Sequence, residues 1–386
     1  MKNNCIIKKW HSQKKLLTIC IVLQLLLATN NFAQSNSSKS QSTNAPNLII
    51  ITTDGFRWQE VFNGMDFEIA NKSKFNHGDS AYLYKKYGAN TISERQKLLM
   101  PFFWNTISSQ GQLFGNRNKE NKVDVANPHW FSYPGYNEIF TGYPDSAINS
   151  NDYAPNPHSN LMAFLNKQKA YQGKVIAFGA WDAYNRILNE TVSGFPVING
   201  FESVQSILKD STTDILASIL KDSYKPFKEV ECLDVFTHYQ AMHYLKTKQP
   251  KVMYISYGET DEWAHHANYS NYLDAANQVD AWIADIWNWV QSTPGYKNNT
   301  YIIVTTDHGR GFGDAWTDHG ADVRGASSIW FALLGPNVKN NPLLAIDKLG
   351  EQDTANQLFQ KQLAATITKL IGYPFIAEHP VGAAIY

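Results

Sequence analysis

Cysteine is scarce in this sequence, and its scarcity excludes a fold held together by disulfides. Only 3 cysteines occur among the 386 residues. Cys5 and Cys20 lie in an N-terminal segment that we expect to be removed, which leaves Cys232 without an intrachain partner. The folded chain must therefore be stabilised by burial of a core, with a further contribution from any metal that it binds.

Net charge is also absent, because 34 Lys and Arg residues balance 34 Asp and Glu residues. This balance argues against attraction to nucleic acid or to an anionic membrane through net charge. We therefore expect no nucleic-acid-binding surface. The sequence shows no internal repeat.

Long apolar runs are missing as well. The apolar run Leu16–Ala28 is too short to cross a membrane comfortably as a helix. Basic residues precede it and small residues such as Ala33 follow, a pattern typical of a signal peptide. We predict a signal peptide at 1–34, a flexible linker at 35–46 and one folded domain at 47–386, hence a periplasmic or secreted protein. No stable membrane anchor is expected after cleavage; a retained signal anchor is the alternative.

Two similar stretches stand out in what the sequence does contain. Asn47–Thr53 is followed by Asp54 and Gly55, and the run 301–306 is followed by Asp307, His308 and Gly309. Unbroken apolar, β-branched runs are typical of parallel strands that are covered on both faces. The carboxyl ends of such strands meet at one edge of the sheet, so Asp54 and Asp307 should lie close together. Two neighbouring carboxylates are costly unless a cation lies between them.

A third strand, Lys251–Tyr257, precedes Asp261 and His265. These two side chains share one face if a helical turn follows the strand, and they can then bind the same ion. A further imidazole, His319, follows across a Gly-rich loop. Asp and His ligands without cysteine suit Zn²⁺ best, with Mn²⁺ possible.

Ser132 stands at the start of another predicted helix. We expect Pro134 and Gly135 to form a turn and Tyr136–Thr141 to form a helix that Gly142 closes. Ser132 would then lie just before the helix N-terminus, where backbone N–H groups favour an anion such as an alkoxide or a phosphate. An ordinary serine N-cap is the alternative.

Other segments complete an α/β pattern. Helices are predicted at Met100–Ser109, through most of Phe195–Lys248 and at Asn271–Val290, and a strand is predicted at Gly173–Gly179. His238, His243 and His266 are not expected to bind metal. The first two lack a partner at ligand spacing, and His266 projects away from Asp261 and His265.

Together these motifs resemble the alkaline phosphatase superfamily, and most nearly its type I phosphodiesterase/nucleotide pyrophosphatase branch. The resemblance covers nearly all of 47–386 and rests on five segments: Asp54-Gly55-Phe56-Arg57, Ser132-Tyr133-Pro134 through Thr141-Gly142, Asp261 with His265, Asp307-His308-Gly309, and His319. It implies a three-layer sandwich with a mostly parallel central sheet and helices on both faces.

The resemblance also implies roles for these residues. One divalent metal would be held by Asp261, His265 and His319. The other would be held by four residues: Asp54, Asp307, His308 and Ser132. Ser132 would be the nucleophile of a two-metal hydrolase of phosphate esters, which would act on diesters, nucleotide pyrophosphates or monoesters through a phosphoseryl intermediate.

The substrate phosphate should also contact an amide. The resemblance implies an Asn shortly after Tyr143-Pro144, and Asn151 is our prediction, although Asn149 fits nearly as well. A neutral amide suits the single charge of a diester, whereas a dianionic monoester usually gains from a cation such as Arg186 or Lys174.

Three alternatives remain open. A sulfatase would carry Arg where this chain has Tyr136. A phosphotransferase or mutase of the same superfamily fits the close spacing of His308 and His319, but it would not need a signal peptide. A non-catalytic secreted binding protein would be indicated by the loss of a metal ligand, and none is lost. The usual diesterase nucleophile is Thr, so Ser132 is a departure from that branch.

Overall fold

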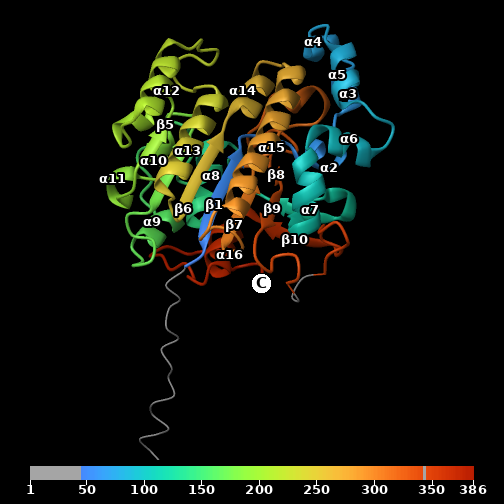
Figure 1. Ribbon diagram of the computed structural model, residues 1–386. Helices are drawn as coiled ribbons and strands as arrows, with labels where there is room; N and C mark the ends of the chain where they lie inside the picture. The colour runs from blue at the N-terminus through green and yellow to red at the C-terminus, as the bar shows by residue number, and fades with distance from the viewer. Residues whose placement is uncertain (1–44, 342–344) are drawn as a thin grey trace, which may run out of the picture. The chain divides into compact units, whose positions relative to one another are not determined.

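A seven-stranded sheet runs through the part of the chain that the computed structural model describes, residues 45–341 and 345–386 (Figure 1). The strand order is β2-β9-β7-β1-β6-β4-β5. The strands are β1 (Asn47–Thr53), β2 (Gln112–Phe114), β4 (Val175–Gly179), β5 (Val197–Asn199), β6 (Val252–Tyr257), β7 (Thr300–Thr305) and β9 (Phe331–Leu334). The predicted signal peptide and nearly all of the predicted linker lie outside the described residues.

Strand β1 is central and parallel to both neighbours. Ile51 pairs with Ile255 of β6 on one side and with Val304 of β7 on the other. The pairing is antiparallel only at the edge formed by β9 and β2. All four strands predicted from the sequence are present in this sheet, so the prediction of a mostly parallel sheet is confirmed.

Helices cover both faces of the sheet. Ile49 and Ile51 belong to a core cluster with residues of α13 (Asp234–Lys248) and α15 (Tyr269–Ser292), which lie in front of the strands in Figure 1. On the opposite face, Phe140 in α8 (Ser132–Thr141) packs against Tyr254, with 4.7 Å between the two ring centroids. Residues that alternate along a strand point to opposite faces, so each strand contributes to two apolar layers. The predicted three-layer sandwich is confirmed.

The other helices are mostly short. They are α2 (Trp58–Asn63), α3 (Phe67–Ala70), α4 (Ser73–Asn76), α5 (Ser80–Tyr87), α6 (Ile92–Leu99), η2 (Arg117–Lys119), α9 (Leu161–Asn166), α10 (Tyr184–Ile187), α11 (Glu190–Ser193), η3 (Val204–Ser206), α14 (Glu259–His265), η4 (Gly313–Thr317), η5 (Gln360–Gln362) and α16 (Leu363–Leu370). In the part of the chain described here, none of the helices has the length and apolar character needed to cross a membrane.

Several local features differ from the sequence prediction. The segment predicted to be helical at Met100–Ser109 contains the π-helical turn η1 (Phe103–Ile107) and continues as α7 (Ser108–Gln110). Within Phe195–Lys248, α12 (Ser211–Asp222) and α13 are preceded by the edge strand β5. A second sheet with the order β10-β3-β8 was not predicted; it comprises β10 (Asn356–Phe359), β3 (Asn121–Asp124) and β8 (Ser328–Ile329). Strands of two to four residues are too short to show a period in the sequence.

The predicted turn before Tyr136 is wrong, because α8 begins at Ser132 and includes Pro134 and Gly135. Proline is tolerated in the first turn of a helix, where its missing N–H has no helical partner to lose. Gly135 allows a close approach to the backbone after β7: a Cβ at this position would lie 2.4 Å from the carbonyl oxygen of Asp307. The helix start is therefore pressed directly against the end of the central sheet.

Candidate active site

The predicted acidic and imidazole side chains gather where three adjacent strands end. Asp54 directly follows β1, and Asp307 follows β7 after one residue. Asp261 and His265 lie in α14, the helix that their spacing requires, which starts just after β6 (Figure 1). Because β6 and β7 both pair with β1, the three strand ends are neighbours at the carboxyl edge of the sheet.

Asp54, Asp307 and His308, which we call the Asp54 group, place one possible ligand atom each within 4.8 Å of one another. Nε2 of His308 lies 3.3 Å from Oδ1 of Asp54 and 3.5 Å from Oδ2 of Asp307. The other ring nitrogen, Nδ1, donates to the carbonyl oxygen of Gly309 at 2.9 Å. This bond holds the proton on Nδ1 and directs the Nε2 lone pair of neutral His308 toward the carboxylates, the arrangement that a metal ligand needs.

Asp261, His265 and His319, the Asp261 group, lie beside the first group. Nε2 of His265 is 3.0 Å from Oδ2 of Asp261 and 3.0 Å from Nε2 of His319. Nε2 of His308 is 3.8 Å from Oδ1 of Asp261, and the rings of His308 and His319 are 4.0 Å apart between centroids. His308 therefore stands where the two groups meet.

Several buried atoms in these groups have no hydrogen-bond partner among the described residues. They are Oδ1 of Asp54, Oδ2 of Asp307 and Nδ1 of His319. A buried polar atom without a partner is costly, and a buried charge more so. Unpaired carboxylate oxygens beside imidazole nitrogens fit divalent cations, so the donor set has the chemistry of a metal centre.

Electrostatics supports the same interpretation. Burial and the neighbouring Asp54 carboxylate raise the pKa of Asp307 well above its usual range. Burial opposes protonation of His308, but Asp307 and the other carboxylates around it raise its pKa to about 9. The metal-free site therefore retains protons that a divalent cation would displace on binding.

Ser132 is the first residue of α8, a helix of ten residues, and its Oγ lies 3.3 Å from Nε2 of His308. The hydroxyl thus reaches the point where the two groups meet. Two residues of the same helix secure its position: Gly135 packs against Asp307, and the hydroxyl of Tyr136 donates to Oδ2 of Asp54 at 2.8 Å. The N-terminal end of the helix faces the acidic edge of the sheet, where the positive end of the helix dipole favours an anionic oxygen.

Asn151 lies next to the Ser132 helix. Its Oδ1 accepts a hydrogen bond of 3.0 Å from the backbone N–H of Tyr133, and no described residue accepts from its Nδ2. Asn149 is exposed and makes no side-chain hydrogen bond to that helix in the described structure. Of the two candidates, Asn151 is therefore the one with an amide donor beside Ser132.

Of the two cations considered for a monoester phosphate, Arg186 is bonded to backbone carbonyl oxygens and Lys174 lies at the other end of the strands. Arg186 donates through Nη1 to the carbonyl oxygens of Asn151 and Tyr153, at 3.3 and 2.6 Å. Lys174 precedes β4, at the amino end of the strands, on the opposite edge of the sheet from Asp54. Arg186 thus fixes the loop that carries Asn151, and Lys174 is too remote to bind the same phosphate.

The structure adds one residue to the site that the sequence did not single out. Arg310 is buried, and its Nη1 donates to Oδ1 of Asp261. Burial opposes the ionisation of Asp261, but Arg310 and the two imidazoles of the group hold its pKa well below the usual range. The available signal was its place directly after Asp307-His308-Gly309 and between two glycines.

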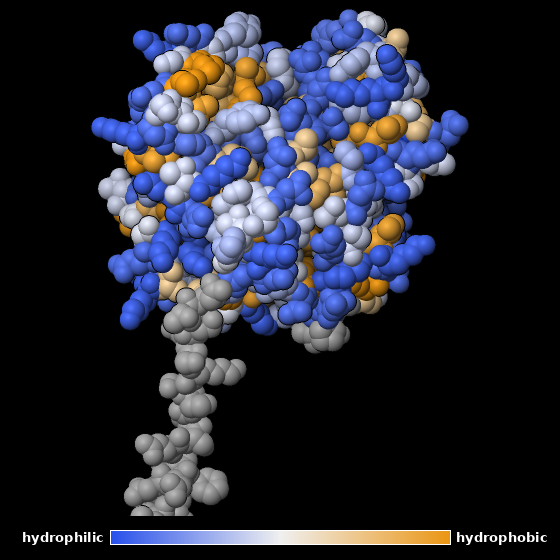
Figure 2. Space-filling model, in the orientation of Figure 1, coloured by the Kyte–Doolittle hydropathy of each residue, from blue (hydrophilic) through white to orange (hydrophobic). Residues whose placement is uncertain are grey.

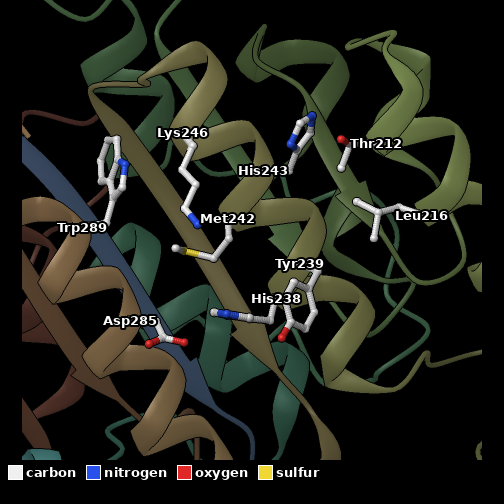
Figure 3. A pocket seen from close by; sticks show the side chains of 9 residues that line it. All are labelled: Thr212, Leu216, His238, Tyr239, Met242, His243, Lys246, Asp285 and Trp289. Atoms are coloured by element: carbon white, nitrogen blue, oxygen red, sulfur yellow. The ribbon is translucent and has the colours of Figure 1, made fainter.

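The histidines expected to be structural lie elsewhere. Nδ1 of His238 shares a hydrogen bond of 2.9 Å with the Tyr257 hydroxyl, and its ring stacks on Trp282. Nε2 of His243 lies 2.8 Å from Oδ2 of Asp210. Both line a cavity of about 430 Å³ between α12, α13 and α15, shown in Figure 3. None of the residues that line it belongs to the two metal-ligand groups. His266 is half exposed and contacts the carbonyl oxygen of Glu262 at 2.8 Å.

The surface over α12 is partly apolar. Figure 2 shows an apolar patch at the upper left, where Figure 1 places this helix. Ile215 and Ile219, one helical turn apart, are exposed there. The patch and the cavity beside it contain no side chain from the Asp54 or Asp261 group.

The comparison with protein families agrees with this geometry. Residues 63–321, more than half of the chain, match the model of the type I phosphodiesterase/nucleotide pyrophosphatase family. The chain belongs to this family. The match contains Ser132, Asp261, Asp307, His308 and His319. The family belongs to the alkaline phosphatase superfamily, as the sequence motifs predicted, and this superfamily includes hydrolases of phosphoric and sulfuric esters. No curated protein matches the chain.

Solved structures share the fold at low sequence identity. The phosphonate monoester hydrolase of Agrobacterium radiobacter is similar with a TM-score of 0.53 and 11% identity, over 88% of this chain and 76% of that chain. The lipoteichoic acid synthase LtaP from Listeria monocytogenes is similar with a TM-score of 0.52 and 14% identity, over 88% of this chain and 75% of that chain. These similarities show that this family member shares an alkaline-phosphatase-like fold with them.

Proposed function

We propose that this type I phosphodiesterase family member is an exported two-metal hydrolase that cleaves phosphodiesters through a phosphoseryl intermediate on Ser132. The observation that carries the proposal is the position of the Ser132 hydroxyl, 3.3 Å from the His308 nitrogen at which two Asp/His groups meet. Export rests on the leader sequence at 1–34.

The two groups provide the ligands of a metal centre. Asp54, Asp307 and His308, with the Ser132 oxygen, would hold one divalent ion. Asp261, His265 and His319 would hold the other. Zn²⁺ suits these donors best and Mn²⁺ is possible. When bound, two such ions supply positive charge for the phosphoryl oxygens and lower the pKa of hydroxyl groups near them.

The chain's own residues orient the reaction. Ser132 attacks phosphorus in line, so that the bond from phosphorus to Oγ forms while the bond to the leaving alcohol breaks and that alcohol takes up a proton. Water then attacks phosphorus and releases Oγ as the Ser132 hydroxyl. The positive end of the α8 dipole faces the developing negative charge, and Asn151 adds a neutral donor through Nδ2.

The distribution of cations favours a diester over a monoester. Arg186 is bonded to backbone carbonyl oxygens, Lys174 lies at the other edge of the sheet, and Arg310 is paired with Asp261. Beside Ser132 the phosphate therefore meets the neutral donor Asn151. A diester carries one negative charge, and it needs less compensation than the dianion of a monoester. Phosphonate monoesters, the substrate class named for one structural neighbour, carry the same single charge and are the second candidate.

A sulfatase activity has less support. The Arg that a sulfatase motif requires is replaced by Tyr136, whose hydroxyl is bonded to Oδ2 of Asp54. Tyr136 thus has a defined contact with a predicted metal ligand, and the position offers no guanidinium. A non-catalytic binding protein on this fold would keep the geometry and show no turnover.

The test is a comparison of initial rates on four aryl esters with the purified mature protein: bis-p-nitrophenyl phosphate, p-nitrophenyl phenylphosphonate, p-nitrophenyl phosphate and p-nitrophenyl sulfate. We expect the first to be hydrolysed fastest and chelator to abolish the reaction. A preference for p-nitrophenyl phosphate or sulfate would contradict the diester assignment, and metal-bound protein inactive on all four would favour the binding protein.

Asn151 offers a further prediction. Replacing it with alanine should lower kcat/KM for the diester by roughly tenfold to a thousandfold, the cost of one lost transition-state donor. Both metals should stay bound, because Asn151 contacts the Tyr133 backbone and no predicted ligand side chain. The matched control is Asn149→Ala, which should leave the kinetics unchanged. Normal kinetics in Asn151→Ala would remove this residue from the phosphate site.

A further inference from the structure

Arg310 is a buried cation fixed inside the predicted metal centre. Its Nε donates to the carbonyl oxygen of Trp316 at 2.8 Å, and Nη2 donates to the carbonyl oxygen of Thr317. Nη1 donates to Oδ1 of Asp261. The first two bonds hold the guanidinium on the backbone of the loop that leads to His319, so the charge stays at this place whether or not Asp261 is available.

The space for the guanidinium depends on Gly55. A Cβ at this position would lie 2.5 Å from Oδ1 of Asp261, 2.9 Å from Nη1 of Arg310 and 3.1 Å from Cε1 of His308. Because Gly55 has no side chain, Arg310 can reach Asp261 beside the His308 imidazole. Gly55 also has a φ of 56°, which favours glycine. The cation is therefore within the ligand cluster and not on its rim.

The contact of Arg310 with His265 opposes metal binding by His265 and must be broken when a metal binds. Nη2 of Arg310 lies 3.3 Å from Nδ1 of His265. A guanidinium only donates, so Nδ1 must accept, and a neutral His265 then carries its proton on Nε2. Nε2 is the nitrogen that faces Asp261 and His319 at 3.0 Å. A metal on Nε2 requires that nitrogen without its proton, and the proton would move to Nδ1, where it would meet the Arg310 N–H.

We propose that Arg310 is a built-in competitor of the metal in the Asp261 group, so that this group binds a divalent ion more weakly than the Asp54 group does. A metal that enters this group must break the contacts of Arg310 with Asp261 and His265, while the guanidinium stays close by on the carbonyl oxygens of Trp316 and Thr317. Among the described residues, no Lys or Arg side chain is bonded to the carboxylates of the Asp54 group: Oδ1 of Asp54 and Oδ2 of Asp307 accept no hydrogen bond and face only Nε2 of His308, itself a predicted ligand. This inference deepens the proposed function, since it rests on the two-metal centre.

If Arg310 had a purely structural role, its replacement would change the metal affinity in the opposite direction. If the guanidinium only oriented Asp261 and His265 for the metal, its removal would weaken metal binding, as the loss of outer partners of metal ligands usually does, by roughly 10–100-fold. If it competes with the metal, its removal tightens binding. The direction of the change therefore separates the two roles.

The experiment titrates metal-free protein with Zn²⁺ and, separately, Mn²⁺ by calorimetry. For the wild type we expect two steps whose dissociation constants differ at least tenfold, the weaker step disappearing in His319→Ala. In Arg310→Met the weaker step should tighten at least tenfold, and in Arg310→Lys, which keeps the charge but loses the planar fork, it should change less. The matched control is Arg324→Met, an exposed residue of the same loop region, which should bind like the wild type.

Two results would overturn the competition: equal affinities of both steps in the wild type, or an Arg310→Met step that is unchanged or weaker. The comparison of the two binding steps in the wild type needs no variant, so it tests the competition even if Arg310→Met fails to fold. A wild-type protein that binds no metal in either step would instead contradict the proposed two-metal function, and this outcome differs from all those above.

Discussion

Replacing Ser132 with alanine should lower kcat on the diester substrate by a thousandfold or more, on the order of the loss seen when a covalent nucleophile is removed. The reason is that the Ser132 hydroxyl is the oxygen that the α8 helix start brings to His308, at 3.3 Å from its Nε2. No other described Ser or Thr hydroxyl has a hydrogen bond to that nitrogen. Rapid quenching of the wild type during turnover of bis-p-nitrophenyl phosphate should show one p-nitrophenyl phosphoryl group, the part of the diester that remains after one alcohol has left, on the peptide that contains Ser132.

Ser132→Thr is the matched control, because it keeps a hydroxyl and adds only a methyl group. It should retain measurable activity, whereas Ser132→Ala should not. Thermal stability should be close to wild type in both. Both should still bind two metals at saturating concentration, since Ser132→Ala removes one of four ligands of its ion and Asp54, Asp307 and His308 remain. Substantial turnover by Ser132→Ala would mean that water attacks the substrate directly and would remove the phosphoseryl intermediate from the mechanism.

Asp307→Asn should have two effects of opposite sign. In chelator the variant should be more stable than the wild type, by roughly 1–3 kcal/mol, because burial beside Asp54 makes the Asp307 carboxyl costly to ionise, whereas the asparagine amide is neutral and needs no proton. The second oxygen position still accepts from the backbone N–H of Gly55, at 3.0 Å in the wild type. With metal present the order should reverse, since the variant loses a ligand of the Asp54 group.

The reversal is large enough to measure. A metal at a hundred times its dissociation constant stabilises the native state by about 2.7 kcal/mol, and the variant should lack this gain at that site. Thermal unfolding of both proteins, with chelator and with Zn²⁺, gives the four values needed, and elemental analysis gives the metal content. Activity of Asp307→Asn should fall with the lost metal. Equal stabilisation of wild type and variant by Zn²⁺ would show that Asp307 is not a ligand.

The sequence by itself determined the strand ends and the chemistry at them. Asn47–Thr53 and Thr300–Thr305 are apolar, β-branched runs of the kind typical of buried parallel strands. A carboxylate follows each of them. A sheet of parallel strands has only one carboxyl edge, so the approach of Asp54 and Asp307 follows from the pattern. The spacing of Asp261 and His265 similarly requires a helix after β6, and α14 is that helix.

Sequence reasoning failed where the outcome depends on contacts between distant segments. The start of α8 was placed too late, because Pro134 and Gly135 are turn residues in local statistics. Gly135 lies in the helix and packs against the backbone of Asp307, 172 positions away in the sequence, and no local pattern records such a contact. The short strands β5 and β10 were missed for a related reason: they are defined by the partners they pair with, not by a period of their own.

The tertiary structure alone decided which polar residues surround Ser132. Asn151 and Asn149 are equivalent in the sequence, but only Asn151 reaches the Tyr133 N–H, because the loop is fixed by Arg186 at the carbonyl oxygens of Asn151 and Tyr153. Arg310 directly follows Asp307-His308-Gly309 in the sequence, which does not predict a contact with Asp261. That contact is possible because Gly55, at the end of another strand, leaves room for the guanidinium. Motifs determine which atoms can bind a metal; the packing of segments far apart in the chain determines which charges share the site with it.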